Sequence, residues 1–211
     1  MAPPADAIAH LVAADPVLAG LVERCGPPET ARDPSRPAPS DHYGALLRAI
    51  VGQQLSTKAA RAIYARVVAF FDGRTPSPEQ VLAADPEALR QAAGLSRAKV
   101  AFLRSLAEHV ISGELELDRL HELPDDEIIA ELCAVKGIGE WSAHMFLIFQ
   151  LERPDVMAPG DLGIRRAVER AYGLPELPAP ADVLALADAW RPYRSVACRL
   201  LWRSLDNVPA P

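Results

Sequence analysis

Apolar residues recur every three or four positions along most of the chain, which is the spacing of amphipathic helices. Between residues 41 and 52, for example, Leu46, Leu47, Ile50 and Val51 follow it, and Gly52 ends the pattern. No stretch alternates apolar and polar residues as a half-buried strand would. The predicted helical stretches are 5–25 with a break at Asp15-Pro16, 41–52, a stretch capped by Ser56 or Thr57, 76–82, 86–93, 96–112, 125–135, 140–151, 162–172, 181–190 and 195–204. We therefore predict an all-α protein of about ten helices.

Composition narrows the class of protein. Half of the 211 residues are hydrophobic and only 6% are aromatic, which favours helices over sheets. No apolar run reaches the ~20 residues of a membrane span, and the first residues lack a basic segment before an apolar one. We therefore expect a cytoplasmic protein without a membrane partner. Cys25, Cys133 and Cys198 lie far apart, so we expect neither a zinc site nor an iron–sulfur cluster.

The most informative stretch runs from residue 132 to residue 161. Gly137-Ile138-Gly139 interrupts a helical pattern, an apolar run follows, and Pro159-Gly160 breaks the chain just before Asp161. Two glycines spaced by one residue allow positive φ and a tight turn from helix to helix. The amide N–H groups of such a turn point outward beside a helix N-terminus and can bind an anion. An ordinary turn between two helices remains the alternative.

Three further motifs extend this pattern in a fixed order. They are Gly52-Gln53-Gln54-Leu55-Ser56, Gly94-Leu95-Ser96-Arg97-Ala98-Lys99, and a segment from Trp190 to Trp202 that contains Arg194-Ser195. Together with Lys136, Trp141 and Asp161, they resemble the 3-methyladenine DNA glycosylase II family of helix-hairpin-helix DNA glycosylases. The resemblance implies two helical subdomains with a cleft between them, one of residues 42–153 that ends in the hairpin and one of residues 1–41 and 154–211. It also implies that the N-terminal β domain of larger members is absent.

Asp161 is the candidate catalytic residue. Hydrolysis of an N-glycosidic bond passes through an oxocarbenium-like sugar, which a carboxylate can stabilise while water attacks. An Asp directly after Pro-Gly and before a helical pattern is also a typical N-cap. Capping and catalysis are compatible, and the resemblance places the catalytic Asp at this position.

The resemblance implies a base pocket that contains Trp141, Met145, Leu162 and Trp202. Indole faces suit a positively charged alkylated purine through cation–π attraction. Core packing remains the alternative for Trp141 and Met145. Trp141 stands where bifunctional relatives carry a Schiff-base lysine, so we expect no strand cleavage. Met145 and Leu162 replace tyrosines of the best-known bacterial pattern, which indicates a more open pocket and a wider range of lesions.

The expected partner is double-stranded DNA. The resemblance assigns DNA contacts to two segments, Gln53, Gln54, Leu55 and Ser56 in one and Lys136, Gly137 and Gly139 in the other, with Gln54 or Leu55 filling the gap left by the flipped base. It also implies a monovalent cation, Na⁺ or K⁺, bound by the carbonyls of Cys133, Val135 and Ile138. The net charge of −6 disfavours strong non-specific DNA binding. Arginines do cluster locally, at Arg165, Arg166 and Arg170 and again at Arg191, Arg194, Arg199 and Arg203.

We therefore predict a monomeric, monofunctional DNA glycosylase that removes 3-methyladenine and related alkylated purines and so begins base excision repair. A bacterial, nucleoid-associated enzyme is expected. A non-catalytic helix-hairpin-helix DNA-binding module is one alternative. A glycosylase for oxidised or mismatched bases is the other, although such relatives usually carry the lysine or the iron–sulfur loop that this sequence lacks.

Overall fold

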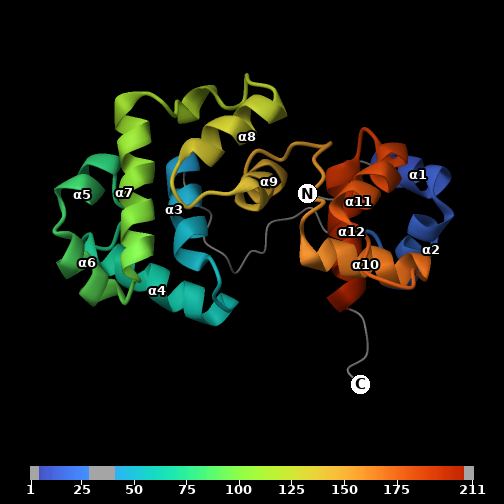
Figure 1. Cartoon of the computed structure of the whole chain (residues 1–211), viewed down its shortest axis with the longest axis horizontal. Helices are drawn as coiled ribbons and strands as arrows, with labels where there is room; N and C mark the ends of the chain where they lie inside the picture. Colours follow the sequence, from blue (N-terminus) through green and yellow to red (C-terminus); the bar gives the residue numbers. More distant parts are fainter. Residues whose placement is uncertain (1–4, 29–40, 207–211) are drawn as a thin grey trace. The chain divides into compact units, whose positions relative to one another are not determined.

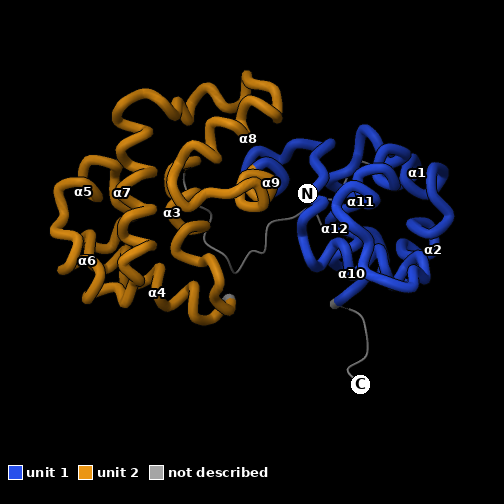
Figure 2. Tube along the Cα trace, viewed as in Figure 1, with its two compact units in different colours: residues 1–37, 147–211 blue, residues 38–146 orange. Residues whose placement is uncertain are grey.

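The computed structural model describes residues 5–28 and 41–206, and every regular element within these ranges is a helix (Figure 1). This confirms the predicted all-α class. The chain divides into two compact units, Ala38–Phe146 and Met1–Pro37 with Leu147–Pro211 (Figure 2). The division falls inside helix α9 (Glu140–Phe149), and the predicted subdomain ends at residues 41 and 153 stay a prediction. Most of the proline-rich stretch of residues 26–40 lies outside the described residues.

Helix α3 forms the centre of the unit Ala38–Phe146. Its residues Leu46, Leu47, Ile50 and Val51 are buried as their spacing predicts. Helices α4 and α7 both pack against α3, and α7 also contacts α5 and α6. The helices of this unit are α3 (His42–Gly52), α4 (Thr57–Phe70), α5 (Pro78–Ala83), α6 (Pro86–Ala93), α7 (Arg97–Ser112), a short 3-10 helix (Leu117–Arg119), α8 (Asp125–Ala134) and the greater part of α9.

Side-chain caps set where these helices begin. Ser56 accepts the amide of Ala59 and is therefore the N-cap of α4, one of the two residues predicted for this role. The helix predicted from residue 76 begins at Pro78 instead. Ser77 and Gln80 form a capping box there, with each side chain bonded to the other residue's backbone amide. The pattern of apolar residues alone does not show this, since it contains no information about caps.

The other unit consists of the two N-terminal helices and the C-terminal part of the chain. Helix α12 packs against α2 and α10, and α1 packs against α2. The last residues of the predicted stretch 181–190 form a 3-10 helix, Asp188–Trp190, rather than α-helix. The helices are α1 (Ala5–Ala14), α2 (Pro16–Cys25), α10 (Leu162–Tyr172), α11 (Pro180–Ala187) and α12 (Arg194–Asp206). None of the described helices is long and apolar enough to cross a membrane.

Asp15 is a buried carboxylate that accepts hydrogen bonds from α2, from α10 and from the 3-10 helix Asp188–Trp190. Its Oδ1 accepts the amides of Val17 at 2.8 Å and Leu18 at 3.3 Å, which makes it the N-cap of α2. Its Oδ2 accepts the indole Nε1 of Trp190 at 2.9 Å and the hydroxyl of Tyr172. Burial by itself would raise the pKa of Asp15, but these four hydrogen bonds outweigh it and lower the pKa below its ordinary 3.8.

We predict that Asp15→Ala lowers the free energy of unfolding by about 3 kcal/mol or more, because a cap is lost and two buried donors lose their acceptor. Asp15→Asn keeps an acceptor for the cap and should cost less. The folded-state pKa is depressed, so the carboxylate's contribution is complete above pH 3.8 and is lost as the pH falls through the folded-state value. Urea unfolding across acidic pH measures this. A wild-type advantage over Asp15→Asn that stays constant down to about pH 2 would contradict it.

Candidate functional site

Asp161 begins helix α10, as the capping interpretation requires. Its Oδ1 accepts the amide of Ile164 at 2.8 Å, so Asp161 is the N-cap of this helix. The same oxygen accepts the indole Nε1 of Trp202, on α12, at 2.9 Å. The side chain is half-buried. A carboxylate that accepts one bond from the helix and one from a neighbouring helix has a fixed orientation, as electrostatic stabilisation of a developing cation requires.

Gly163 leaves the space in which the indole of Trp202 reaches Asp161. A Cβ at position 163 would lie 3.0 Å from the Oδ1 of Asp161 and 3.2 Å from the Cδ1 of Trp202. Both contacts are shorter than ordinary van der Waals distances, so a side chain here would push the indole or the carboxylate away. Nothing in the sequence indicated this role, because it depends on a residue that lies about forty positions later in the chain.

Phe149 completes an aromatic stack beside the carboxylate. Its ring lies parallel to the indole of Trp202, with 5.6 Å between centroids and 26° between planes. The guanidinium carbon of Arg199 lies 4.8 Å from the centroid of Phe149, a cation–π contact, and Nη2 of Arg199 donates to the carbonyl of Ile148 at 2.7 Å. Burial lowers the pKa of Arg199. Phe149 remains 47% exposed and was not predicted as a site residue.

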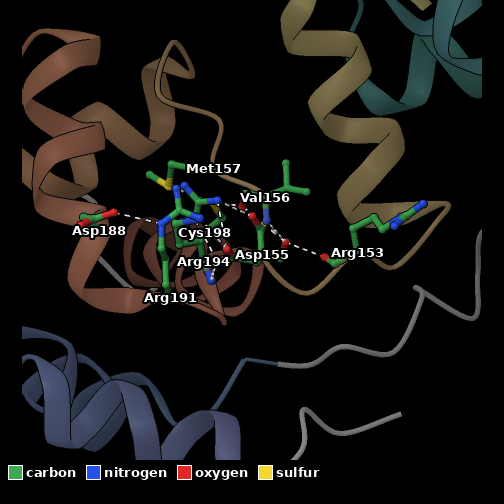
Figure 3. Close-up of polar contacts among 9 residues, drawn as sticks. Arg153, Asp155, Val156, Met157, Asp188, Arg191, Arg194 and Cys198 are labelled. Atoms are coloured by element: carbon green, nitrogen blue, oxygen red, sulfur yellow. Dashed lines mark hydrogen bonds and ion pairs between the residues drawn. The ribbon is translucent and has the colours of Figure 1, made fainter. Parts of the chain in front are cut away.

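The loop that leads to Asp161 is fastened to the start of α12 (Figure 3). Asp155 accepts bonds from Nε of Arg194 at 2.8 Å and from Nη1 of Arg191 at 2.9 Å. Ser195 donates its hydroxyl to the carbonyl of Arg153 at 2.6 Å and accepts the amide of Val156 at 2.9 Å. The Arg194-Ser195 pair of the C-terminal motif thus positions the segment before the candidate catalytic residue.

The structure separates the predicted pocket residues by exposure. Leu162, the first residue of α10, is 48% exposed beside Asp161. Trp141, in the first turn of α9, is 51% exposed, which argues against the core-packing alternative for this residue. Met145, four residues later, is half-buried. Trp141 and Leu162 belong to different units, and the pocket assignment stays a prediction.

The predicted hairpin between α8 and α9 is a turn that depends on only one of its glycines. The amide of Ile138 donates to the carbonyl of Val135 at 3.0 Å, and Gly137 between them has φ +90°. A Cβ at Gly137 would lie 2.2 Å from the ring of Phe102. Gly139 has no positive φ, and a Cβ at this position would meet nothing within 4 Å.

The polar backbone groups of the hairpin fit its predicted ligands. Within residues 41–206, the amides of Gly137 and Gly139 donate to no protein acceptor, as a phosphate site requires. Lys136 is exposed beside them. The carbonyls of Cys133 and Ile138 also accept no hydrogen bond from the described residues, whereas that of Val135 accepts the turn amide. The carbonyls therefore suit a monovalent cation, which stays a prediction.

The residues of the segment between α3 and α4 differ in exposure and in the contacts of their side chains. Gln54 and Leu55 are exposed, Leu55 by 37%, and Gln54 has φ 57°. Ser56 is used as the cap of α4. The side chain of Gln53 points back into its own unit and donates to the carbonyl of Gly137 at 2.8 Å. Of the four residues predicted to contact DNA here, Gln54 and Leu55 are the ones that the structure leaves available.

Comparison with known proteins identifies the family. The model of the HhH-GPD superfamily of base excision DNA repair proteins matches residues 47–192. The chain belongs to this superfamily. DNA-3-methyladenine glycosylase 1 of Schizosaccharomyces pombe is 38% identical over 164 residues, which cover 77% of this chain and 72% of that protein. DNA-3-methyladenine glycosylase 2 of Escherichia coli is 30% identical over 77% of this chain, which spans 57% of that protein's length.

Solved structures of HhH-GPD proteins agree. A DNA-3-methyladenine glycosidase of Bacillus halodurans superposes with a TM-score of 0.84 at 38% identity, covering 98% of this chain and 92% of that one. The S. pombe 3-methyladenine DNA glycosylase in complex with abasic DNA superposes with a TM-score of 0.81 at 35% identity, covering 94% of this chain and 95% of that one. The predicted family is thus confirmed, and with it the predicted class of enzyme, a glycosylase of base excision repair.

The arginine clusters of this HhH-GPD chain serve mainly its own fold. Five of them donate a side-chain N–H to a carbonyl or carboxylate of the same unit: Arg165, Arg191, Arg194, Arg199 and Arg203. Arg166 and Arg170, on α10, are exposed. Few of these clustered arginines are therefore left for other contacts, and the chain as a whole has a net charge of −6.

The two hairpin glycines should respond differently to substitution. We expect Gly137→Ala to lower the melting temperature, because φ +90° and the ring of Phe102 both exclude a Cβ. Gly139→Val should melt near the wild-type temperature yet weaken binding of damaged and undamaged duplexes equally, since phosphate contacts position the protein without reading bases. Thermal melting and fluorescence anisotropy test this. Weaker binding of damaged DNA alone would assign Gly139 to the base pocket instead.

Proposed function

We propose that this protein is a monofunctional DNA glycosylase that flips alkylated bases, 3-methyladenine and related purines foremost, out of duplex DNA and hydrolyses the N-glycosidic bond. The observation that carries the proposal is the carboxylate of Asp161, oriented by the amide of Ile164 and the indole of Trp202. The relatives from S. pombe, E. coli and B. halodurans are all named for 3-methyladenine, which supports the substrate class.

For this reaction the protein has to supply mainly a negative charge at a fixed position beside the sugar. When the bond between C1′ and the base nitrogen breaks, its electron pair leaves with the base, so a cationic alkylated purine departs as a neutral molecule. The sugar becomes an oxocarbenium ion, and the carboxylate of Asp161 stabilises it. Water then adds to C1′ and gives its proton to the carboxylate or to solvent. The product is an abasic site.

The pocket would recognise the flipped base by its charge and flatness. Trp141 and Trp202 offer indole rings, on which a cationic purine stacks with added cation–π attraction. Met145 and Leu162 offer apolar surface without a hydroxyl, so the pocket would select by shape more than by hydrogen bonds. Because Trp141 has no amine, no Schiff base forms at this position, and the enzyme would leave the DNA strand intact.

Duplex DNA would be held by backbone groups more than by side-chain charge. The hairpin amides of Gly137 and Gly139 would bind a phosphate, with Lys136 beside them and a monovalent cation at the carbonyls of Cys133 and Ile138. Leu55 or Gln54 would fill the gap left by the flipped base. The protein would act as a monomer on the nucleoid of a bacterial cell.

A non-catalytic DNA-binding module is the alternative, and Asp161 separates it from the enzyme. Asn is about as good an N-cap as Asp, so Asp161→Asn should preserve the start of α10 apart from about 0.3–1 kcal/mol of charge–dipole stabilisation. Single-turnover base release from methylated duplex should fall by about 10²–10³-fold or more, because a neutral amide cannot offset the developing charge.

Asp85→Asn is the matched control for Asp161→Asn. Asp85 caps α6 through the amide of Ala88 at 2.7 Å, so the control loses a cap charge in the unit that does not contain Asp161. It should release base at the wild-type rate. Near-wild-type release by a folded Asp161→Asn variant would reduce Asp161 to a cap, and absence of release by the wild type would favour the binding module.

A second assay concerns the product and the range of lesions. We expect strand breaks only after alkali or heat, and no adduct on borohydride treatment, because Trp141 replaces the Schiff-base lysine. The enzyme should also release etheno bases and methylated cytosine from duplexes, in addition to 3-methyladenine, since Met145 and Leu162 would leave the pocket open. A trapped covalent adduct would refute the first expectation, and activity confined to 3-methyladenine would refute the second.

A further inference from the structure

Gln53 lies at the junction of the two segments expected to touch DNA. It is the C-cap of α3, and its amide donates to the carbonyls of Ala49 and Ile50. It is also the first residue of the insertion loop, residues 53–56, which presents Gln54 and Leu55. Its motif suggested a DNA contact, but its side chain makes contacts within its own unit instead.

The backbone of Gln53 is fixed by Lys99. The ammonium of Lys99, from α7, donates to the carbonyl of Val51 at 2.7 Å and to that of Gln53 at 2.9 Å. These are carbonyls at the end of α3 that have no partner within the helix, so a half-buried cation suits them. Burial lowers the pKa of Lys99. Two of the sequence motifs, Gly52–Ser56 and Gly94–Lys99, thus meet at one carbonyl.

The side chain of Gln53 extends this fixed point to the hairpin. Its Nε2 donates to the carbonyl of Gly137, 84 residues away, at 2.8 Å, and lies 3.5 Å from the hydroxyl of Ser142 on α9. Gly137 is the residue with φ +90°, and its amide donates to no acceptor among the described residues. A single side-chain amide therefore joins the insertion loop to the turn whose N–H groups are expected to bind a phosphate.

The next residue shows that the loop is held in one conformation. Gln54 has φ 57°, a region that residues with a Cβ adopt only when the surroundings impose it. The amide of Leu55 donates to the carbonyl of Gly52 at 3.3 Å, which closes the turn and leaves the side chain of Leu55 exposed. A rigid loop with an exposed apolar tip suits insertion between bases.

We propose that Gln53 is a positioning residue that couples the insertion loop to the hairpin, so that binding a phosphate and filling the gap in the base stack occur as one rigid event. Gln53 acts through Leu55 and Gly137 and contacts no DNA itself. The inference rests on the proposed function only in that it takes damaged duplex DNA as the ligand. The contact needs a side-chain donor, which glutamine has. A glutamate at this position would place a second acceptor beside the carbonyl of Gly137.

The test measures gap preference, defined as the affinity for a duplex with a tetrahydrofuran abasic site divided by the affinity for the intact duplex. It needs no base release, so it is separate from the test of catalysis. Gln53→Ala and Gln53→Glu should lower the gap preference about fivefold to tenfold, the factor that one lost hydrogen bond corresponds to. Ser142→Ala, the matched control, removes only the 3.5 Å contact and should keep the wild-type preference.

A double-mutant cycle with Leu55→Ala shows whether Gln53 acts through the loop. Once Leu55 is truncated, Gln53→Ala should lower the gap preference no further. Three results would overturn the proposal: additive effects in the cycle, a parallel loss of affinity for both duplexes, or a wild type with no gap preference. If the wild type releases no base but the cycle is non-additive, the proposed activity fails and the coupling by Gln53 stands.

Discussion

One hydrogen bond, from the indole of Trp202 to the carboxylate of Asp161, connects the features of the candidate catalytic site. It lies in the space left by Gly163, it joins α12 to the start of α10, and its indole stacks on Phe149 with 26° between the planes. The same oxygen also caps α10. A residue that begins a helix has little freedom to move, so capping makes Asp161 a better-oriented electrostatic partner for a cationic sugar.

The loop before Asp161 is also held by a few side-chain contacts. Asp155 accepts two guanidinium groups, and Ser195 bridges the backbone on both sides of it. Five of the seven clustered arginines thus bond within their own unit, whereas Arg166 and Arg170 are exposed. For a chain with a net charge of −6, the proposed phosphate contacts would come from backbone amides and a few exposed basic side chains.

The unit Ala38–Phe146 shows the same principle with one ammonium group and one side-chain amide. Lys99 and Gln53 satisfy carbonyls that the end of α3 and the hairpin turn leave without partners. Satisfying these groups is a general requirement of buried backbone. Here it also fixes the exposed tip of the insertion loop relative to the outward amides of the hairpin, so a structural requirement and the proposed function are met by the same residues.

The sequence by itself determined what depends on neighbours along the chain. Apolar spacing predicted the helices, and Ser56 or Thr57 was predicted to start one of them, because helix periodicity and capping act over three or four residues. The ordered motifs predicted the family. It also determined that Asp161 begins a helix.

Only the tertiary structure decided which distant groups meet. That Gly137 but not Gly139 needs to be glycine depends on the ring of Phe102, and the role of Gly163 depends on Trp202. Whether Gln53 faces DNA or the hairpin depends on a carbonyl 84 residues away. Such contacts arise when helices pack, and packing selects among side-chain orientations that the local sequence leaves equally open.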